Sequence, residues 1–337
     1  MFETIIVEGA KMEETNMLNK NSLLFTPILK TKRTSEYNAL KELSPLISNN
    51  ETIVPYIECI KNFSENDVQK YIKQLSGCRF FVEPQPEDVN QVLNNLASIP
   101  GGCILSLRVL TSTNLNELEL FINTCRRNNK HFAIKIYDAD DRFISNIKTM
   151  SDEDYLFVEI GGNPYSSSSF LDDLRDCNLK CNIIIHSNER EQYLKGEDFM
   201  DGGYNECSNF NFSIINAIKD GSFAFDGFGS RCGTKNDTTE DVKMSRAVYG
   251  VFLVFDYEEN NFYSLRSTEK EHISKVYNSF KEKIKDNLAF LELRFFNKTN
   301  ISRDVLEKYI SAAKFSASKA ITITIIRYIE EVTNNLL

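Results

Sequence analysis

The chain has 337 residues, with 39 Lys and Arg against 48 Asp and Glu, a formal net charge of −9, and 42% hydrophobic residues. That apolar content is enough for one large hydrophobic core or two ordinary ones. The acidic balance does not indicate a nucleic-acid partner, and no apolar run has the length of a membrane span, so we expect neither kind of binding. The first residues carry acidic side chains and no apolar stretch, which is unlike a secretory leader.

The eight cysteines form no CxxC pair, and most lie in or beside apolar runs. This pattern is typical of reduced, buried thiols and indicates a cytoplasmic protein. A disulfide framework or a zinc site fits the spacing less well, because the only close pair is Cys177 and Cys181.

Eight short apolar runs, rich in β-branched and aromatic residues, follow one another along the chain. Nearly continuous apolar character is typical of strands that are buried on both faces. The predicted strands are 24–30, 52–58, 79–84, 102–110, 131–138, 155–162, 181–187 and 222–229.

Amphipathic helical patterns separate these strands, whose starts follow one another at roughly 25-residue intervals before a longer last one. A βα unit needs about that much chain, so we expect parallel strands joined by right-handed crossovers. Eight units predict an α/β fold of the (β/α)8 TIM-like barrel type over residues 23–235. A doubly wound open parallel sheet is the alternative, although the first strand lacks the Gly-rich turn that often follows it there.

Beyond residue 235 the pattern changes. Residues 248–267 predict an antiparallel hairpin, and helices are expected at 268–286, 301–315 and 318–332. We expect residues 236–337 to pack on the barrel, and residues 1–22 to form an N-terminal extension. The hairpin and the final helices are the candidate surface for a protein partner or for a homo-oligomer.

Each predicted strand carries one titratable residue at or near its carboxyl end. In a (β/α)8 barrel these ends form the rim that holds the active site. The eight residues are Lys30, Glu58, Glu83, Arg108, Lys135, Glu159, His186 and Asp226. Two interpretations stay open, a ligand-binding or catalytic rim and a structural ring of ion pairs.

Particular subsets suggest particular chemistry. Glu83, Glu159, His186 and Asp226 offer ligands of the kind that Mg²⁺ and Mn²⁺ accept, but no local ligand motif supports a metal, so none is assigned. Lys135 lies between apolar residues, where it would either form a Schiff base or pair with a neighbouring carboxylate.

The segment 226–231 offers an anion site after the last strand. Gly227 and Gly229 would let a phosphate approach the backbone, and Arg231 would bind it through its guanidinium group. The alternative is a tight turn with an arginine that faces solvent.

The opening of the chain resembles the "beta protein" family, named from a T-even bacteriophage protein. The resemblance rests on Phe25-Thr-Pro-Ile-Leu-Lys30, then Glu36-Tyr-Asn-Ala-Leu with Leu43-Ser-Pro45, and then Pro55-Tyr-Ile-Glu58. Later, Asp226-Gly-Phe-Gly229 and Phe262-Tyr-Ser-Leu-Arg266 are similar in place to family features, while residues 1–22 depart from the family's usual start. The resemblance implies a setting in phage–bacterium conflict, points to Lys30, Glu58, Asp226 and Arg266, and implies no particular reaction.

Two functions are therefore expected. The first is a cytosolic recognition or effector component that binds a polar ligand or a protein partner at the rim. The second is a hydrolase or lyase acting on a phosphorylated or otherwise anionic small molecule. In the second, Glu83, Glu159, His186 and Asp226 supply acid–base groups, while Lys30, Arg108 and Arg231 hold the anion. No cofactor is indicated.

Overall fold

The computed structural model describes a set of ranges that together cover most of the chain. They are residues 23–31, 34–110, 113–137, 145–160, 174, 177–187, 203–204, 210–221, 225–230, 247–259, 261–267, 269–296 and 300–337. The predicted extension 1–22 and the predicted anion-binding Arg231 lie outside the described residues.

One parallel sheet organises the first two thirds of the chain. Its strands are β1 (Leu24–Phe25), β2 (Ile28–Lys30), β3 (Tyr56–Glu58), β4 (Phe80–Glu83), β5 (Cys103–Val109), β6 (Phe132–Tyr137), β7 (Tyr155–Glu159), β8 (Asn182–Ser187) and β10 (Gly227–Ser230). They lie in the order β1-β10-β8-β7-β6-β5-β4-β3-β2, and all the neighbouring pairs are parallel. All but β10, which extends one residue past the predicted run 222–229, fall within the eight predicted runs, and the α/β prediction is confirmed.

The first predicted strand closes this sheet on itself. Its two halves, β1 and β2, are separated by Thr26-Pro27. Strand β1 pairs with β10, and strand β2 pairs with β3 on the other side. The Thr26 N–H donates to the Phe228 carbonyl (2.8 Å) on one side, while the Phe25 carbonyl accepts from the Val54 N–H (2.9 Å) on the other. The sheet is therefore a (β/α)8 barrel in which β1 and β2 together count as one strand.

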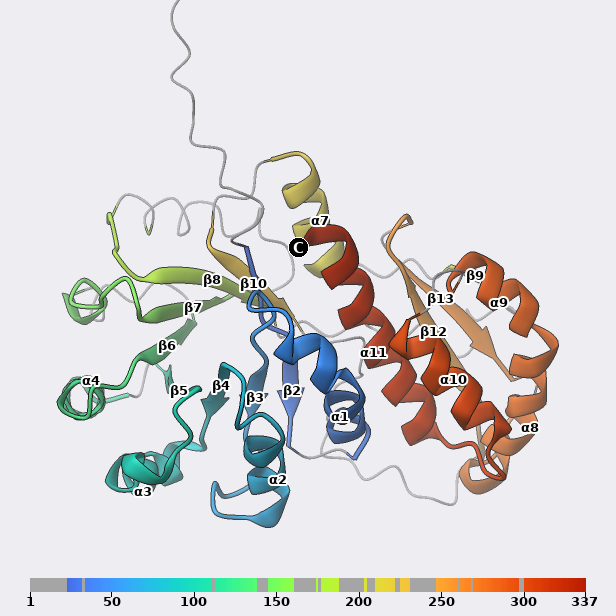
Figure 1. The fold of residues 1–337 in the computed structure, drawn as a ribbon, viewed down its shortest axis with the longest axis horizontal. Helices are drawn as coiled ribbons and strands as arrows, with labels where there is room; N and C mark the ends of the chain where they lie inside the picture. Colours follow the sequence, from blue (N-terminus) through green and yellow to red (C-terminus); the bar gives the residue numbers. More distant parts are fainter. Residues whose placement is uncertain are drawn as a thin grey trace, which may run out of the picture.

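Helices follow the strands and cover the outside of the sheet, as Figure 1 shows for the first four. They are α1 (Thr34–Ser48), α2 (Asn66–Gln74), α3 (Val89–Asn94), α4 (Leu115–Arg127) and α7 (Phe210–Lys219), with short 3₁₀ turns at Pro86–Asp88 and Leu96–Ser98. Asn114 caps α4 by accepting a hydrogen bond from the Asn116 N–H (3.0 Å).

Alternate residues of each strand belong to two different cores. Leu29, Ile57 and Val82 pack outward in the large cluster with the helices. Ile28, Tyr56 and Phe81 belong to a second, smaller cluster, which fills the barrel interior. The two-residue period of a strand thus decides which residues face the interior at the barrel's carboxyl end.

The C-terminal part adds a second, antiparallel sheet. The predicted hairpin is confirmed as β12 (Val251–Asp256) and β13 (Asn261–Arg266), and β9 (Gly203–Tyr204) pairs with β13. Strands β11 (Ala247–Val248) and β14 (Glu271–His272) come before and after the hairpin in the sequence and form a short antiparallel pair. Three helices follow: α8 (Ile273–Asp286), α9 (Leu288–Arg294) and α10 (Ile301–Ser311). Within the described ranges, none of the helices has both the length and the apolar character needed to cross a bilayer.

The last helix, α11 (Ala317–Leu336), joins the two parts and lies between them in Figure 1. Its Tyr328 ring contacts the Phe25 ring edge-on at 6.1 Å, and its hydroxyl bonds the Ser230 hydroxyl at 2.8 Å. Phe25 also stacks on Phe228 of β10 at 5.1 Å. Helix α11 therefore covers the seam between the first and last barrel strands, the place that the helix after the eighth strand takes in a (β/α)8 barrel.

Two threonines inside α11 bind neighbouring elements as well as their own helix. The Thr324 hydroxyl lies 2.7 Å from the Leu253 carbonyl of β12 and 3.1 Å from the Ala320 carbonyl one turn back. The Thr322 hydroxyl lies 3.2 Å from the Ser35 carbonyl of α1. These contacts compensate for the weak helix propensity of threonine, because each hydroxyl satisfies a carbonyl of the packed partner.

Candidate functional site at the carboxyl end of the barrel

The site is built by the two-residue period of the strands. Ile28, Tyr56 and Phe81 lie in the barrel interior, so the residues two positions further along each strand face the same way at its carboxyl end. Lys30, Glu58 and Glu83 are these residues, and they lie side by side because Lys30 pairs with Glu58 and Glu58 with Glu83 in register. By the same spacing Lys135, Glu159 and His186 follow Ala133, Phe157 and Ile184.

Charged side chains from these strands form a continuous series of ion pairs. Lys30 Nζ lies 3.5 Å from Glu58 Oε2, and the other oxygen of Glu58 lies 2.9 Å from Arg108 Nη2. Arg108 Nε in turn lies 2.6 Å from Glu83 Oε1. One arginine therefore bridges the carboxylates of two neighbouring strands.

The series continues through the centre of the barrel. Lys135 Nζ lies 3.3 Å from Glu83 Oε2 and 2.8 Å from Glu159 Oε2, although its angles do not meet hydrogen-bond geometry. The Tyr56 hydroxyl donates to Glu83 Oε2 (2.5 Å) and lies 2.9 Å from the Ser106 hydroxyl. We call the six ion-paired residues, Lys30, Glu58, Glu83, Arg108, Lys135 and Glu159, the charged ring.

The charged ring is buried and balanced. The side chain of Lys135 is 0% exposed, and only Arg108 has substantial solvent contact, at 24% of its side-chain surface. Three cations face three carboxylates, so the described ring carries no net charge when all six are ionised. Burial opposes the charge on Lys135, but Glu83 and Glu159 outweigh it and raise the pKa of the ammonium above its ordinary value. The ammonium therefore stays protonated at neutral pH, which does not favour Schiff-base formation.

His186 lies next to the ring but outside its ion pairs. Its Nε2 lies 2.8 Å from the Thr26 hydroxyl, and its ring packs against Tyr56 and Phe157 at centroid distances of 4.6 and 4.3 Å. Burial, together with the positive charges of Lys135 and Arg108, holds the pKa of His186 well below its usual range. The imidazole is therefore neutral at physiological pH.

This neutral histidine makes stability depend on pH. The unfolded chain takes up a proton on His186 as the pH falls below about 6.5, while the folded chain does not, so acid favours unfolding. Between pH 7 and pH 5 we expect this one group to remove about 2 kcal/mol from the free energy of unfolding. Urea denaturation at both pH values should show a loss in the native chain that exceeds the loss in His186→Gln by that amount. His272→Gln, which alters an exposed histidine, serves as the control, and equal losses in all three chains would contradict the prediction.

The predicted glycine loop is instead part of the last strand. Gly227 and Gly229 lie in β10, whose backbone pairs with β8, so the prediction that their amides form an open phosphate-binding loop is wrong. A Cβ at position 229 would lie 2.1 Å from the Thr26 hydroxyl oxygen and 2.5 Å from His186 Nε2. Glycine is needed there because the Thr26–His186 hydrogen bond occupies the space of a side chain.

The substitution Gly229→Ala tests this packing. We expect a loss of roughly 1–3 kcal/mol in the free energy of unfolding, because the added methyl group must displace Thr26 or His186. Gly101→Ala is the matched control, since a Cβ there meets nothing within 4 Å. Urea denaturation of both variants measures the difference, and an equal effect at both sites would refute the packing argument.

Asp226 is not at the rim. It precedes β10 rather than ending a strand, and its carboxylate accepts a hydrogen bond from the Ile183 N–H (2.7 Å), near the start of β8. The prediction that places Asp226 with Glu159 and His186 is therefore wrong, because the strand begins later than its apolar pattern indicates. Among the described residues, no three His, Cys, Asp or Glu side chains are grouped so as to hold a metal ion.

Hydrogen bonds with helices α1 and α2 hold the backbone of Lys30, the residue that ends the first predicted strand. The Glu36 carboxylate accepts a hydrogen bond from the Lys30 N–H, and the Tyr71 hydroxyl donates to the Lys30 carbonyl (3.2 Å). Lys30 and Glu58 meet in the charged ring, whereas Arg266 lies in the hairpin and places its guanidinium 4.3 Å from the centre of the Tyr249 ring. Only two of the four positions from the resemblance thus lie in the ring.

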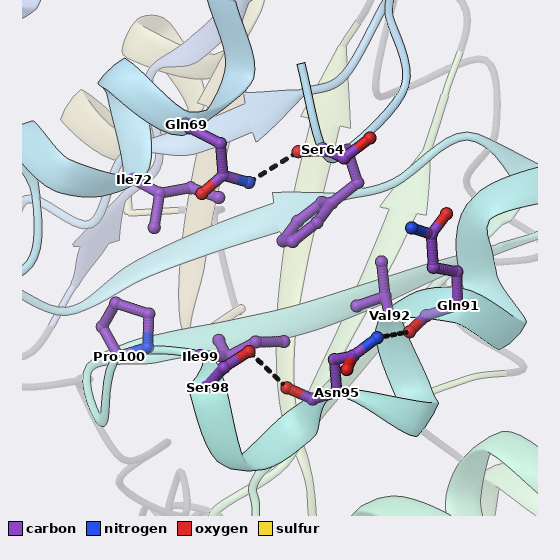
Figure 2. Close-up of a pocket in the computed structure, with 10 residues that line it drawn as sticks. Ser64, Gln69, Ile72, Gln91, Val92, Asn95, Ser98, Ile99 and Pro100 are labelled. Carbon is purple, nitrogen blue, oxygen red and sulfur yellow. Dashed lines mark hydrogen bonds between the residues drawn. The ribbon is translucent and has the colours of Figure 1, made fainter. Parts of the chain in front are cut away.

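A surface pocket between α2 and α3 lies apart from the ring (Figure 2). It has a volume of about 270 Å³, and its lining side chains carry no charge. The Gln69 amide donates to the Phe63 carbonyl (2.6 Å), and the Asn95 amide donates to the Gln91 carbonyl (2.8 Å). Because these amide donors already bind the local backbone, the pocket is a weaker candidate than the ring.

Tyr56, Ser106 and Thr26 also belong to the site, although they are uncharged and do not lie at the carboxyl ends of the predicted strands. Tyr56 and Ser106 bind within the ring, and Thr26 binds His186. The two-residue period of the strands indicates that these residues face the barrel interior. Tyr56 and Ser106 each lie two positions before a ring residue, and Thr26 lies four positions before Lys30.

Comparisons with known proteins add little to this geometry. No protein-family model and no curated protein matches the chain in sequence. A crystal structure of tryptophan synthase from M. tuberculosis in its aminoacrylate-bound form is similar with a TM-score of 0.40 and 9% identity, over 63% of this chain and 84% of the other. Gre2 from Candida albicans matches with a TM-score of 0.20 and 10% identity, over 92% and 99% of the two chains. The fold is therefore defined by its own strand order and register.

Proposed function

We propose that this protein is a recognition component that binds a polar ligand at the carboxyl end of its barrel. The observation that supports the proposal is the charged ring, in which six ionisable side chains from six strands pair with one another. Replacing such buried pairs by apolar residues is often neutral or stabilising, so fold stability alone does not explain them. Barrels of this type carry their function at this end.

The pairing favours binding over catalysis. An acid–base catalyst needs a group whose proton is available near neutral pH. Lys135 is held protonated between two carboxylates, and burial, followed by the nearby Glu83 charge, keeps the pKa of Tyr56 well above its ordinary value. These groups can orient a ligand through hydrogen bonds without exchanging protons with it.

The biological setting is proposed from the resemblance of the opening segment. Two of its matching residues, Lys30 and Glu58, belong to the charged ring, which supports a shared use of this site in phage–bacterium conflict. A cytoplasmic location is supported by the described cysteines (Cys59, Cys78, Cys103, Cys125, Cys177 and Cys181), all of which are free thiols.

A second function, that of a hydrolase or lyase acting on a phosphorylated or otherwise anionic small molecule, has one group in its favour. His186 is neutral, and its Nδ1 has no hydrogen-bond partner within the described part of the chain. A neutral imidazole can accept a proton, and the lowered pKa of His186 makes it a weak general base. Turnover of a bound compound would favour this function, and binding without turnover favours recognition.

A thermal-shift screen tests the binding site. Purified protein is heated with divalent metals, nucleotides, phosphorylated metabolites and neutral sugars. A ligand present at a hundred times its dissociation constant should stabilise the native chain by about 2.7 kcal/mol. We expect Glu159→Gln, which alters the ring, to lose that shift, and Asp226→Asn, which alters a carboxylate away from the ring, to keep it. A shift retained in Glu159→Gln would place the ligand elsewhere.

The C-terminal region keeps its proposed role as a partner surface. On α9, the side chains of Phe290 and Leu293 are exposed, Leu293 at 78%. Exposed apolar side chains of this size support a contact with another protein. Mass measurement of the native chain and of Leu293→Asp would test for a homo-oligomer through this helix.

A further inference from the structure

The hydrogen bonds of Thr26 bear on which nitrogen of His186 carries the proton. The Thr26 hydroxyl lies 3.2 Å from the Phe228 carbonyl, which can only accept, and 2.8 Å from His186 Nε2. The hydroxyl has one proton, and we assign it to the carbonyl, which leaves the hydroxyl oxygen to accept from the imidazole. Nε2 is then the protonated nitrogen, and Nδ1 presents a lone pair.

That lone pair is buried and faces away from the last strand. The Nε2–Cδ2 edge of the ring points at Gly229, where a Cβ would lie 2.5 Å from both atoms, so Nδ1 lies across the ring from it. His186 is 0% exposed, and its Nδ1 has no hydrogen-bond partner within the described residues. On the side opposite β10, Glu159 of β7 lies in register with His186. A buried acceptor without a donor is costly, which indicates a donor that binds there.

The charge around this acceptor indicates what kind of molecule supplies the donor. The three cations of the ring are matched by three carboxylates, so the described ring has no surplus positive charge for a phosphate. The glycines of β10, which would offer backbone amides to an anion, are paired in the sheet. A neutral molecule with several hydroxyl groups can use both the donors and the acceptors of such a ring.

We propose that His186 Nδ1 accepts a hydrogen bond from a hydroxyl group of an uncharged polyhydroxylated ligand, with the tautomer set by Thr26. This inference rests on the proposed ligand site and names its ligand class. It assigns Thr26 as a positioning residue and His186 as the group that contacts the ligand.

Long-range ¹H–¹⁵N correlation spectra test the proposal directly, because the chain has only three histidines. His131→Gln and His272→Gln assign the other two imidazoles. In the free protein at pH 7 we expect His186 to be the Nε2–H tautomer with a bare Nδ1, and Thr26→Val to lose this preference. D-ribose, D-glucose, glycerol and adenosine are then added, with inorganic phosphate as the comparison.

The proposal predicts that at least one neutral compound moves the His186 Nδ1 resonance toward its hydrogen-bonded position while phosphate leaves it in place. It is overturned by an Nδ1–H tautomer, or by a response to phosphate without any response to the neutral compounds. It is also overturned if Nδ1 is already hydrogen bonded in the free protein and no compound changes it, since a buried water then satisfies it. A thermal shift that depends on Glu159 but leaves His186 unmoved would overturn this inference while the proposed binding site stands.

Discussion

The substitution Lys135→Met should lower the free energy of unfolding by about 3–5 kcal/mol at pH 7. Lys135 is fully buried and lies between the carboxylates of Glu83 and Glu159, at 3.3 and 2.8 Å. Removing one partner of a buried ion pair leaves an uncompensated charge in a medium that solvates it poorly. Here the loss of one ammonium affects two carboxylates at once. Urea denaturation monitored by circular dichroism measures the change.

The exposed pair of Lys308 and Glu42, 2.8 Å apart, provides the matched control. Lys308→Met should cost less than about 1 kcal/mol, because water screens the charge that remains. Combining Lys135→Met with Glu83→Gln and Glu159→Gln should recover much of the loss if charge rather than shape is responsible. A cost for Lys135→Met no larger than the control would show that the ring contributes nothing to specifying the fold.

The direction of the Lys135 pKa shift sets the pH range of its contribution. Because the carboxylates raise the pKa of the folded-state ammonium, its stabilising effect is fully present below the ordinary lysine value near 10.5. It is lost only as the pH rises through the higher folded value. The comparison of Lys135→Met with the native chain is therefore made at neutral pH without interference from this titration.

The substitution Tyr328→Ala should also cost about 3–5 kcal/mol of the free energy of unfolding. Tyr328 is fully buried in α11, contacts Phe25 and Phe255, and bonds the Ser230 hydroxyl at 2.8 Å. Its removal would leave a cavity at the seam where the first and last barrel strands meet. Urea denaturation gives the difference from the native chain.

Tyr309→Ala on α10 is the control, because that ring is only partly buried, and we expect about 1 kcal/mol there. A chain ended after residue 313, which lacks α11, should fail to unfold cooperatively. If the shortened chain retained a sharp transition with the native barrel's circular dichroism, α11 would be an accessory to the barrel rather than one of its helices.

Much of the charged ring was predictable from strand pattern alone. A run buried on both faces marks a strand, and the residue that ends its apolar stretch lies at one edge of a parallel sheet. That reasoning locates all six ring residues, which the structure brings together: Lys30, Glu58, Glu83, Arg108, Lys135 and Glu159. Their pairing is not predictable in this way, because periodicity places a side chain on a face without showing which atoms it meets.

The last strand shows where local pattern is misleading. Asp226 looks like the end of an apolar strand and Gly227 and Gly229 look like a loop, yet β10 begins at Gly227. The reason lies far away in the chain, because Gly229 leaves room for a hydrogen bond between Thr26 and His186, 160 positions apart. A single sequence carries no signal for a contact that three distant segments share.

The amino-acid sequence by itself determined the class of this protein, since the number, spacing and double-sided burial of its apolar runs are properties of the local chain. It also determined the hairpin and the inner face of each strand, through the two-residue period. Only the tertiary structure decided that β1 and β2 close the barrel, that α11 returns after residues 231–316 to cover the seam, and that His186 stays outside the ion pairs. The physical reason is that an amphipathic pattern determines which surface of an element must be buried. The element that covers this surface is determined by the packing of the whole chain.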